Sequence, residues 1–388
     1  MELRIWFDSV KARLSRGGMG GAIDWILFAA TLPILGTGLV TMNSFVGENP
    51  LFTRQLSWAL IAIAVFFAFS FIDFRFLRRT GILVAFFLFS VGTLLFLLVS
   101  GEVIRGTQSW LTIGGLSVEP VDPIKLVLIL ILAKYFSRRH IDIANIKHIL
   151  ISGLYAFTLF VLVFLQPDFG SAMIISCIWI GMVMVSGISK KHLAAVILIL
   201  ALTFAGLWFY VFKDYQKQRI LTFLNPLTDI RGAGYNAYQS TIAVGSGQWW
   251  GKGVGYGTQS RLNFLPEYET DFIFAAFAEE WGFFGVILLL LCYAVLVWRI
   301  LVNSMRGATN FEILFGLGLA VLFVSHIFIH VGMNMGLLPI TGITLPLASY
   351  GGSHLLTEFA GLGILMGMRR YSHAAHKEVA KNEFLGPA

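Results

Sequence analysis

The sequence predicts an all-α, polytopic integral membrane protein, and two observations lead to that fold class. Hydrophobic residues make up 57% of the 388 residues and charged residues only 13%, which is about half the charged share of a soluble domain. The apolar residues also gather into ten runs whose lengths suit helices that cross a bilayer. We therefore expect ten transmembrane helices in a single membrane domain that spans 1–388.

The expected spans follow the apolar runs in chain order. They lie near 22–43, 55–73, 81–100, 122–137, 148–166, 169–187, 192–211, 271–298, 312–333 and 343–368. The fourth run is short and begins with Asp122 and Lys125, so its first turn should lie at the interface or face the bundle. Prolines and glycines interrupt 336–354, and broken backbone at membrane depth must be buried in protein or line a cavity.

The positions of lysine and arginine predict the orientation of the spans. Of the 28 such residues, 19 fall on the side of the N-terminus, three fall in short loops on the opposite side, and six lie in one long loop. Because short cytoplasmic loops carry the excess of positive charge, both termini are expected in the cytoplasm, as segments 1–21 and 369–388. The long loop, 213–270, joins the seventh and eighth helices and is expected to be extracytoplasmic.

The net charge of +7 does not indicate a nucleic-acid partner. The positive residues are spread over short loops between spans and form no single basic patch. The two cysteines, Cys177 and Cys292, both lie within apolar runs. We therefore expect no disulfide framework, and both thiols should serve as packing residues.

Three acids stand close together where the long loop re-enters the membrane. Glu267, Glu269 and Asp271 precede an apolar run, and acids suit the start of a helix. A general base or a ligand for a divalent metal is the functional interpretation of the same residues. Glu279 and Glu280 lie deeper in that run, where a carboxylate should face a cavity or polar partners and not lipid.

A second charged segment, 101–125, lies on the same predicted side. It carries Arg105, Glu119, Asp122 and Lys125. Asp122 and Lys125 share a helix face at a spacing of three residues, so a simple ion pair explains them. The functional alternative, which the residues favour equally, is that Lys125 or Arg105 binds a phosphate group.

Three further features have structural explanations. Asp168 suits the start of the helix that follows it. His326 and His330 share a helix face, but no third ligand at a telling spacing accompanies them, so polar contacts between helices are favoured over zinc. The glycine-rich segment 231–261 lacks the spacing of a phosphate-binding loop. Its residue types favour a flexible loop over a groove for an extended substrate.

Five motifs together resemble one family. FLPEYETDFIFAAFAEEWG, GSGQWWGKGVGYGTQS, QPDFGS, EPVDPIK and GLLPITGITLPLASYGGS are similar, in this order and over nearly the whole chain, to the SEDS proteins (shape, elongation, division, sporulation). The wording of the glycine-rich motif is closer to RodA, the elongation member. The TLP that contains Pro346 is closer to FtsW, the division member.

The resemblance implies a peptidoglycan glycosyltransferase with ten spans in the bacterial cytoplasmic (inner) membrane. Such proteins polymerise lipid II, a disaccharide pentapeptide on undecaprenyl pyrophosphate, at the outer face during cell elongation. They work with a class B penicillin-binding protein and are surrounded by membrane lipid. A flippase for the same lipid, or a division-type polymerase, is the alternative. A divalent cation, Mg²⁺ or Mn²⁺, could share the charge of the pyrophosphate, although no metal ligands are assigned.

The resemblance also implies the site residues. Asp271 matches the essential aspartate of the family and is expected to act as the catalytic base. The expected substrate-binding residues lie in or beside the matched motifs: Lys125, Arg105, Asp122, Glu119, Gln259 and Ser349. Four positions depart from the family pattern: Asp122 replaces a glutamate, Glu269 a histidine, His330 an asparagine and His354 a serine.

Overall fold

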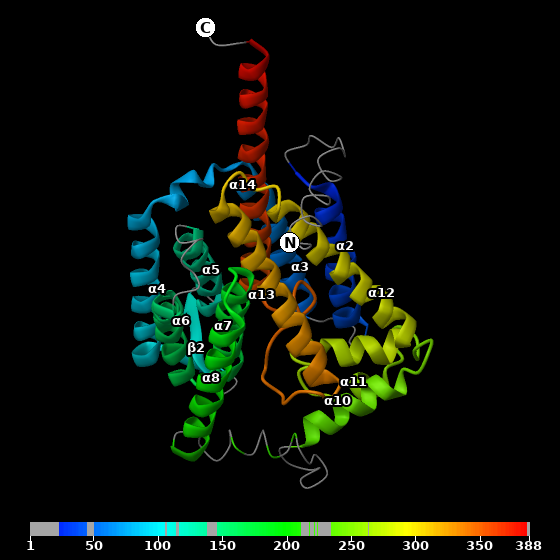
Figure 1. Ribbon diagram of the computed structural model, residues 1–388. Helices are drawn as coiled ribbons and strands as arrows, with labels where there is room; N and C mark the ends of the chain where they lie inside the picture. Colours follow the sequence, from blue (N-terminus) through cyan, green and yellow to red (C-terminus); the bar gives the residue numbers. More distant parts are fainter. Residues whose placement is uncertain are drawn as a thin grey trace.

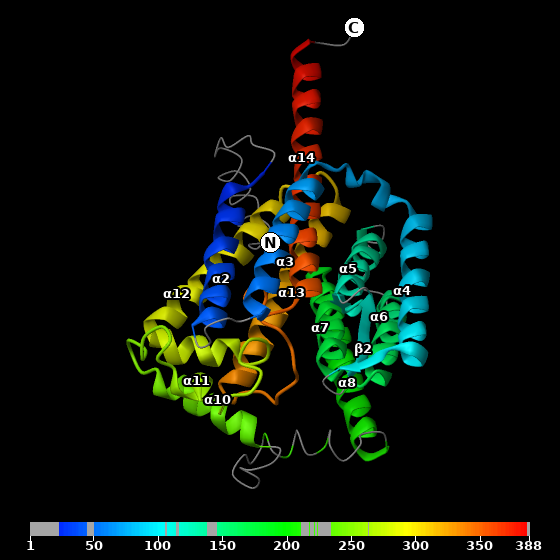
Figure 2. The same ribbon diagram turned by 180° about the vertical axis from the view of Figure 1, so that it is seen from behind.

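The computed structural model describes residues 23–44, 50–104, 107–113, 116–137, 146–210, 234–262 and 264–385, together with 217, 221 and 223. Within these residues the fold is mostly helical (Figure 1). The last helix continues beyond one end of the bundle, and the short helices of the glycine-rich segment lie at the other end (Figure 2).

A helix occupies each of the ten expected spans. The helices are α2 (Trp25–Asn43), α3 (Pro50–Phe71), α4 (Thr80–Ser100), α5 (Val121–Ser137), α6 (Ile146–Leu165), α7 (Phe169–Val185), α8 (Lys190–Tyr210), α12 (Ile273–Ser304), α13 (Asn310–Asn334) and α14 (Gly352–Leu385). Shorter helices are η1 (Phe74–Arg78), α10 (Tyr235–Ser246) and α11 (Thr258–Arg261). Among the described residues, six helices are long and apolar enough to cross a membrane: α2, α3, α4, α6, α12 and α13. The count of ten spans and their orientation stay predictions.

The helices differ in how much of their surface the protein covers. α5 and α13 lie inside the bundle and are buried on most sides, whereas α4 exposes Leu88, Phe89 and Phe96. Exposed apolar faces of this kind suit contact with lipid. Because α5 is central, the side chains of Asp122 and Lys125 in its first turn are buried by protein and do not face lipid.

A small antiparallel sheet precedes α5, so the prediction of an all-α fold is wrong at this point. Strands β1 (Glu102–Ile104), β2 (Thr107–Ile113) and β3 (Leu116–Val118) pair in the order β1-β2-β3. Leu111 pairs with Val118 in the register of the second hairpin. β-branched and aromatic residues favour strands, and β2 is rich in them. The sheet leads the chain directly into the first turn of α5.

The helix expected over 343–368 begins only at Gly352. The preceding residues, 336–351, are largely non-helical. This confirms the prediction of broken backbone, because residues 340–344 line a cavity that is described below.

α12 is interrupted at Gly282, whose φ of 64° and ψ of −167° suit only glycine. Four backbone hydrogen bonds of 2.8, 2.9, 3.0 and 3.2 Å join residues 279–284 to the loop 248–253. They satisfy peptide groups that the break would otherwise leave without partners. The glycines of this loop therefore allow two backbone segments to come into contact. This role differs from the two that the sequence suggested, a flexible loop and a groove for an extended substrate.

The segment 252–258 also surrounds the two buried glutamates of α12. Glu279 accepts hydrogen bonds from Nζ of Lys252 at 2.6 Å and from the N–H of Thr258 at 2.9 Å. Oε1 of Glu280 accepts one from the N–H of Gly255 at 2.6 Å. The prediction that both carboxylates face polar partners is confirmed.

Replacing Gly247 with alanine is expected to destabilise the fold, and Gly245→Ala is the matched control. A Cβ at Gly247 would lie 2.0 Å from the carbonyl oxygen of Ala278, and such overpacking costs about 1–3 kcal/mol or more. At Gly245 nothing lies within 4 Å, and alanine is favoured over glycine in a helix by about 0.5–1 kcal/mol. The melting temperature in detergent should fall only for Gly247→Ala; equal values for the two variants would contradict this packing.

Candidate active site

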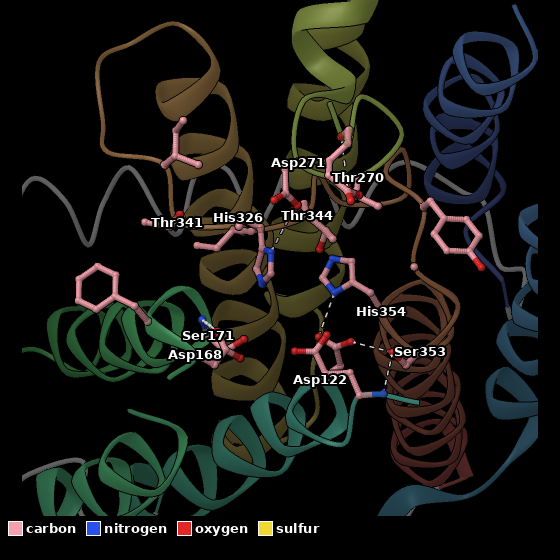
Figure 3. A pocket seen from close by; sticks show the side chains of 18 of the residues that line it. Asp122, Asp168, Ser171, Thr270, Asp271, His326, Thr341, Thr344, Ser353 and His354 are labelled. Carbon is pink, nitrogen blue, oxygen red and sulfur yellow. Dashed lines mark hydrogen bonds and ion pairs between the residues drawn. The ribbon is translucent and has the colours of Figure 1, made fainter. Parts of the chain in front are cut away.

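A cavity of about 500 Å³ lies where the sheet, the broken segments and the ends of several helices meet (Figure 3). Its lining comes from β2, the start of α5, the turn before α7, α10, α13, the loop before α12 and the segment before α14. The lining residues are Trp110, Glu119, Asp122, Lys125, Pro167, Asp168, Phe169, Ser171, Asn236, Glu267, Thr270, Asp271, Phe272, His326, Ile340, Thr341, Gly342, Ile343, Thr344, Tyr350, Gly351, Ser353 and His354. Four of the predicted site residues therefore share one cavity: Asp271, Lys125, Asp122 and Glu119.

Asp271 is half-buried and held through its backbone. Its carbonyl accepts a hydrogen bond from Nδ2 of Asn334 at 3.0 Å, and Oδ1 of Asn334 accepts one from the N–H of Ala275 at 3.1 Å. One carboxylate oxygen of Asp271 lies 3.6 Å from the point that a Cβ on Gly342 would occupy. Asp271 is therefore fixed at the junction of α12, α13 and the broken segment, with its carboxylate against the cavity wall.

Replacing Asn334 with alanine is expected to lower both stability and activity. The fully buried amide joins Asp271 and Ala275 to the end of α13. An unsatisfied buried polar group costs about 1–3 kcal/mol, so the melting temperature should fall by several degrees. The exposed Thr158, which bonds only within α6, provides the control Thr158→Ala. An Asn334→Ala variant that melts with the wild type would show that this amide does not hold the junction.

Ser349 joins the broken segment to the loop that carries Asp271. Its Oγ donates to the carbonyl of Thr270 at 2.7 Å and accepts from the N–H of Leu345 at 2.8 Å. Gln55 of α3 donates to the carbonyl of Ser349 at 3.1 Å and accepts from the N–H of Gly351 at 3.2 Å. Ser349 lies behind the cavity wall, where it connects three parts of the chain.

His326 and His330 bond to the broken segment. Nδ1 of His326 lies 3.2 Å from the carbonyl oxygen of Thr344, and Nδ1 of His330 lies 2.7 Å from that of Ile343. Since carbonyl oxygens only accept, each Nδ1 carries the proton. Among the described residues, no three His, Cys, Asp or Glu side chains form a group that could hold a metal ion. The interpretation of both histidines as polar packing residues therefore fits better than zinc.

Lys125 and Asp122 form a buried ion pair at 3.1 Å on the cavity wall. Asp122 also bonds to residues of α14: Oγ of Ser353 donates to it at 3.1 Å, and Nδ1 of His354 lies 3.2 Å from it. Figure 3 shows these contacts between α5 and α14. The pair is thus structural, and it also faces the space that a substrate would fill.

Two more acids complete this side of the cavity. Burial and then the charges of Asp122 and Asp168 raise the pKa of Glu119 well above its usual range. Asp168 caps α7, because its Oδ1 accepts from the N–H of Ser171 at 2.9 Å. The prediction of a helix cap at Asp168 is confirmed.

Of the two other predicted residues, the structure describes only Gln259, which lies away from the cavity. The N–H of Gln259 donates to Glu279, 3.2 Å from each of its two carboxylate oxygens, and Gln259 is not among the residues that line the cavity. Arg105 lies outside the described residues. Sequence reasoning noted His354 only as a departure from a pattern, and it gave no role to Ser353 or Asn334. The chain separates all three from their partners, so no local spacing could have indicated these contacts.

Comparison with known proteins decides the family. The model of the FtsW, RodA and SpoVE family, described as cell cycle proteins, matches residues 25–374. The chain belongs to this family. The resemblance to SEDS proteins is thus confirmed. As a member of this family with several long apolar helices, the chain is a multi-pass membrane protein. It is 37% identical over 281 residues to the peptidoglycan glycosyltransferase MrdB of Escherichia coli, which covers 72% of this chain and 75% of MrdB.

Solved structures of similar proteins agree with this membership of the FtsW/RodA/SpoVE family. A chain of a peptidoglycan synthase complex, studied for how polymerization and crosslinking are coordinated, superposes with a TM-score of 0.78 at 29% identity and covers 90% of this chain and 98% of its own. The rod shape determining protein RodA of Thermus thermophilus gives a TM-score of 0.67 at 28% identity over 89% and 96% of the two chains. The likeness extends over nearly all of each chain.

Proposed function

We propose that this protein is a peptidoglycan glycosyltransferase that polymerises lipid II during cell elongation. The family membership and the glycosyltransferase relative support the reaction class. The observation that carries the proposal is the cavity itself, which brings the carboxylate of Asp271 and the buried cation of Lys125 to one space. Glycosyl transfer from a lipid pyrophosphate needs a base and a positive charge of this kind.

Asp271 is the proposed base. The 4-hydroxyl of one lipid II sugar attacks the anomeric carbon of the growing strand and gives its proton to Asp271. A new glycosidic bond forms, and the bond between the anomeric carbon and the pyrophosphate oxygen breaks. Because Asn334 holds the carbonyl of Asp271 and Ser349 holds the carbonyl of Thr270, little reorganisation is needed for the proton transfer.

Lys125 is the proposed partner of the leaving pyrophosphate. Five carboxyl groups line the cavity (Glu119, Asp122, Asp168, Glu267 and Asp271), whereas Lys125 is its one lysine or arginine in the described part of the chain. The raised pKa of Glu119 favours its neutral form, which would reduce the repulsion that a pyrophosphate meets there. Arg105 is proposed as a second positive group, and Gln259 and Ser349 stay predicted substrate-binding residues.

The setting of the reaction follows from the predicted topology. With ten spans in the bacterial inner membrane and both termini in the cytoplasm, the cavity would open at the outer face. Lipid II would reach it there, anchored in the membrane by its polyprenyl tail. The similar chain in a peptidoglycan synthase complex supports a class B penicillin-binding protein as the partner that cross-links the new strands.

A divalent cation stays a prediction that no described group of ligands supports. The cation is tested by following polymerisation of labelled lipid II in EDTA and again after Mg²⁺ or Mn²⁺ is restored. An unchanged rate in EDTA would remove the cation from the account.

Glycan synthesis and lipid transport can be separated in proteoliposomes. Protein reconstituted with fluorescent lipid II is expected to produce glycan strands longer than a disaccharide when the penicillin-binding protein is present. Protein that moves the labelled lipid between leaflets, measured by quenching from outside, but yields no strands would overturn the proposal in favour of a flippase.

A further inference from the structure

His354, in the first turn of α14, has a carboxylate at each of its ring nitrogens. Nδ1 lies 3.2 Å from Oδ1 of Asp122, and Nε2 lies 3.0 Å from Oε1 of Glu358. All three side chains are buried. In the view of Figure 3, His354 extends from α14 into the space between Asp122 and Asp271.

Both carboxylates also accept hydrogen bonds from other groups. Asp122 accepts hydrogen bonds from Nζ of Lys125 and Oγ of Ser353, each at 3.1 Å. Oε2 of Glu358 accepts one from the N–H of Leu347 at 2.8 Å. A carboxylate that faces several donors is stabilised in its charged form.

The two contacts determine the protonation state of the ring. A neutral imidazole has one N–H donor and one acceptor nitrogen, whereas an ionised carboxylate only accepts. Nδ1 is hydrogen-bonded to Asp122, and Nε2 lies within ion-pair distance of Glu358 without the alignment of a hydrogen bond. The doubly protonated ring is the state that two carboxylates at these distances stabilise. A neutral ring would point a lone pair at a buried negative charge, which is costly in a low-dielectric site.

The surroundings of the ring agree with this state. The other titratable groups near it are Lys125 of α5, Glu119 ahead of α5, and His326 and His330 of α13. The rings of His326 and His354 have centroids 4.8 Å apart, but His326 donates its Nδ1 proton to Thr344 and leaves both carboxylates to His354. The positive charges of Lys125 and His354 then balance the negative charges of Asp122 and Glu358.

We propose that His354 is a positioning residue that, as an imidazolium between Asp122 and Glu358, fixes the Asp122–Lys125 pair at the cavity wall. The inference rests on the proposed glycosyl transfer. His354 does not touch the reacting atoms in this account. It acts through Asp122, which joins α5 to α14 and so determines where the ammonium of Lys125 lies.

Two variants test the charge of the ring. Glu358→Gln keeps the shape and can still accept from Leu347, but its amide N–H₂ can donate to Nε2 and so favours the neutral ring. His354→Asn removes the charge at every pH. His192→Asn, a partly buried histidine at the start of α8, is the matched control. The rate of glycan synthesis is measured from pH 6 to pH 8 and divided by the wild-type rate at the same pH, which cancels shared titrations.

The expected results differ in their pH dependence. His354→Asn should lower kcat about tenfold at every pH with little change in KM, because a displaced Lys125 weakens the transition state more than substrate binding. Glu358→Gln should match the wild type near pH 6 and lose about tenfold by pH 8, since the ring, with Asp122 as its remaining carboxylate partner, holds its second proton less tightly than in the wild type. His192→Asn should match the wild type throughout.

A relative rate of Glu358→Gln that does not vary with pH, or a His354→Asn variant with wild-type kcat, would overturn the inference. The thermal stability of Glu358→Gln gives a readout that does not need activity. Its melting temperature relative to wild type should fall as pH rises from 6 to 8, because the stabilising imidazolium is lost. If the wild type makes no glycan, the proposed function fails, and this pH-dependent stability still decides the role of His354.

Discussion

Replacing Asp271 with asparagine is expected to lower the rate of glycan synthesis by about 10²–10⁴-fold, the usual contribution of a general base. Asparagine keeps the shape of the side chain and the backbone bonds to Asn334 and Glu267. The melting temperature should therefore stay near that of the wild type. KM for lipid II should change little, because the lost interaction forms only in the transition state.

The measurement is the initial rate of polymerisation on labelled lipid II, with Asp271→Glu beside Asp271→Asn. Glutamate retains a carboxylate but displaces it by one methylene, so its rate should lie between those of the wild type and asparagine. Equal rates for the wild type and Asp271→Asn would remove the base from the mechanism, whatever the role of the rest of the cavity.

Replacing Lys125 with methionine is expected to reduce both stability and activity. Methionine fills a similar volume but leaves Asp122 with only Ser353 and His354. Removal of one partner from a buried ion pair costs about 3–5 kcal/mol. The loss of a positive group that faces the leaving pyrophosphate should lower the rate by about 10²–10³-fold. Rates are compared below the melting temperature of each variant, on protein that is still folded.

A double variant separates the structural role of Lys125 from its catalytic role. Lys125→Met combined with Asp122→Asn removes the unpaired charge, so its melting temperature should recover much of what the single variant loses. Its rate should remain low. If the double variant regained both stability and activity, the ion pair would be structural only, and Lys125 would have no part in binding the pyrophosphate.

Local sequence patterns predicted the helices well. Each of the ten apolar runs contains a helix, because a helix satisfies its own backbone hydrogen bonds when its apolar side chains are buried in lipid or protein. The cap at Asp168 and the interrupted segment before α14 were also predictable, since proline, glycine and a capping side chain act on neighbouring residues. The acids around Asp271 alone left a helix start, a base and a metal ligand open, and only the family resemblance singled out Asp271 as the candidate base.

Contacts between distant segments were not predictable in this way. The loop 248–253 satisfies the peptide groups at the break of α12, and neither segment contains a signal for the other. His354 contacts Asp122, from which it is separated by 232 positions in the chain. The family resemblance indicated only that a serine usually occupies position 354. The three-stranded sheet was missed because its strands are short and lie in a segment read as a polar loop.

The account is tested most directly by the length of the products that the purified protein makes from labelled lipid II in the presence of its penicillin-binding protein. Wild type should give a ladder of long glycan strands on a gel, and Asp271→Asn, equally folded, should give none above background. Strands of equal length from both proteins would contradict the assignment of the cavity at Asp271 as the site of polymerisation.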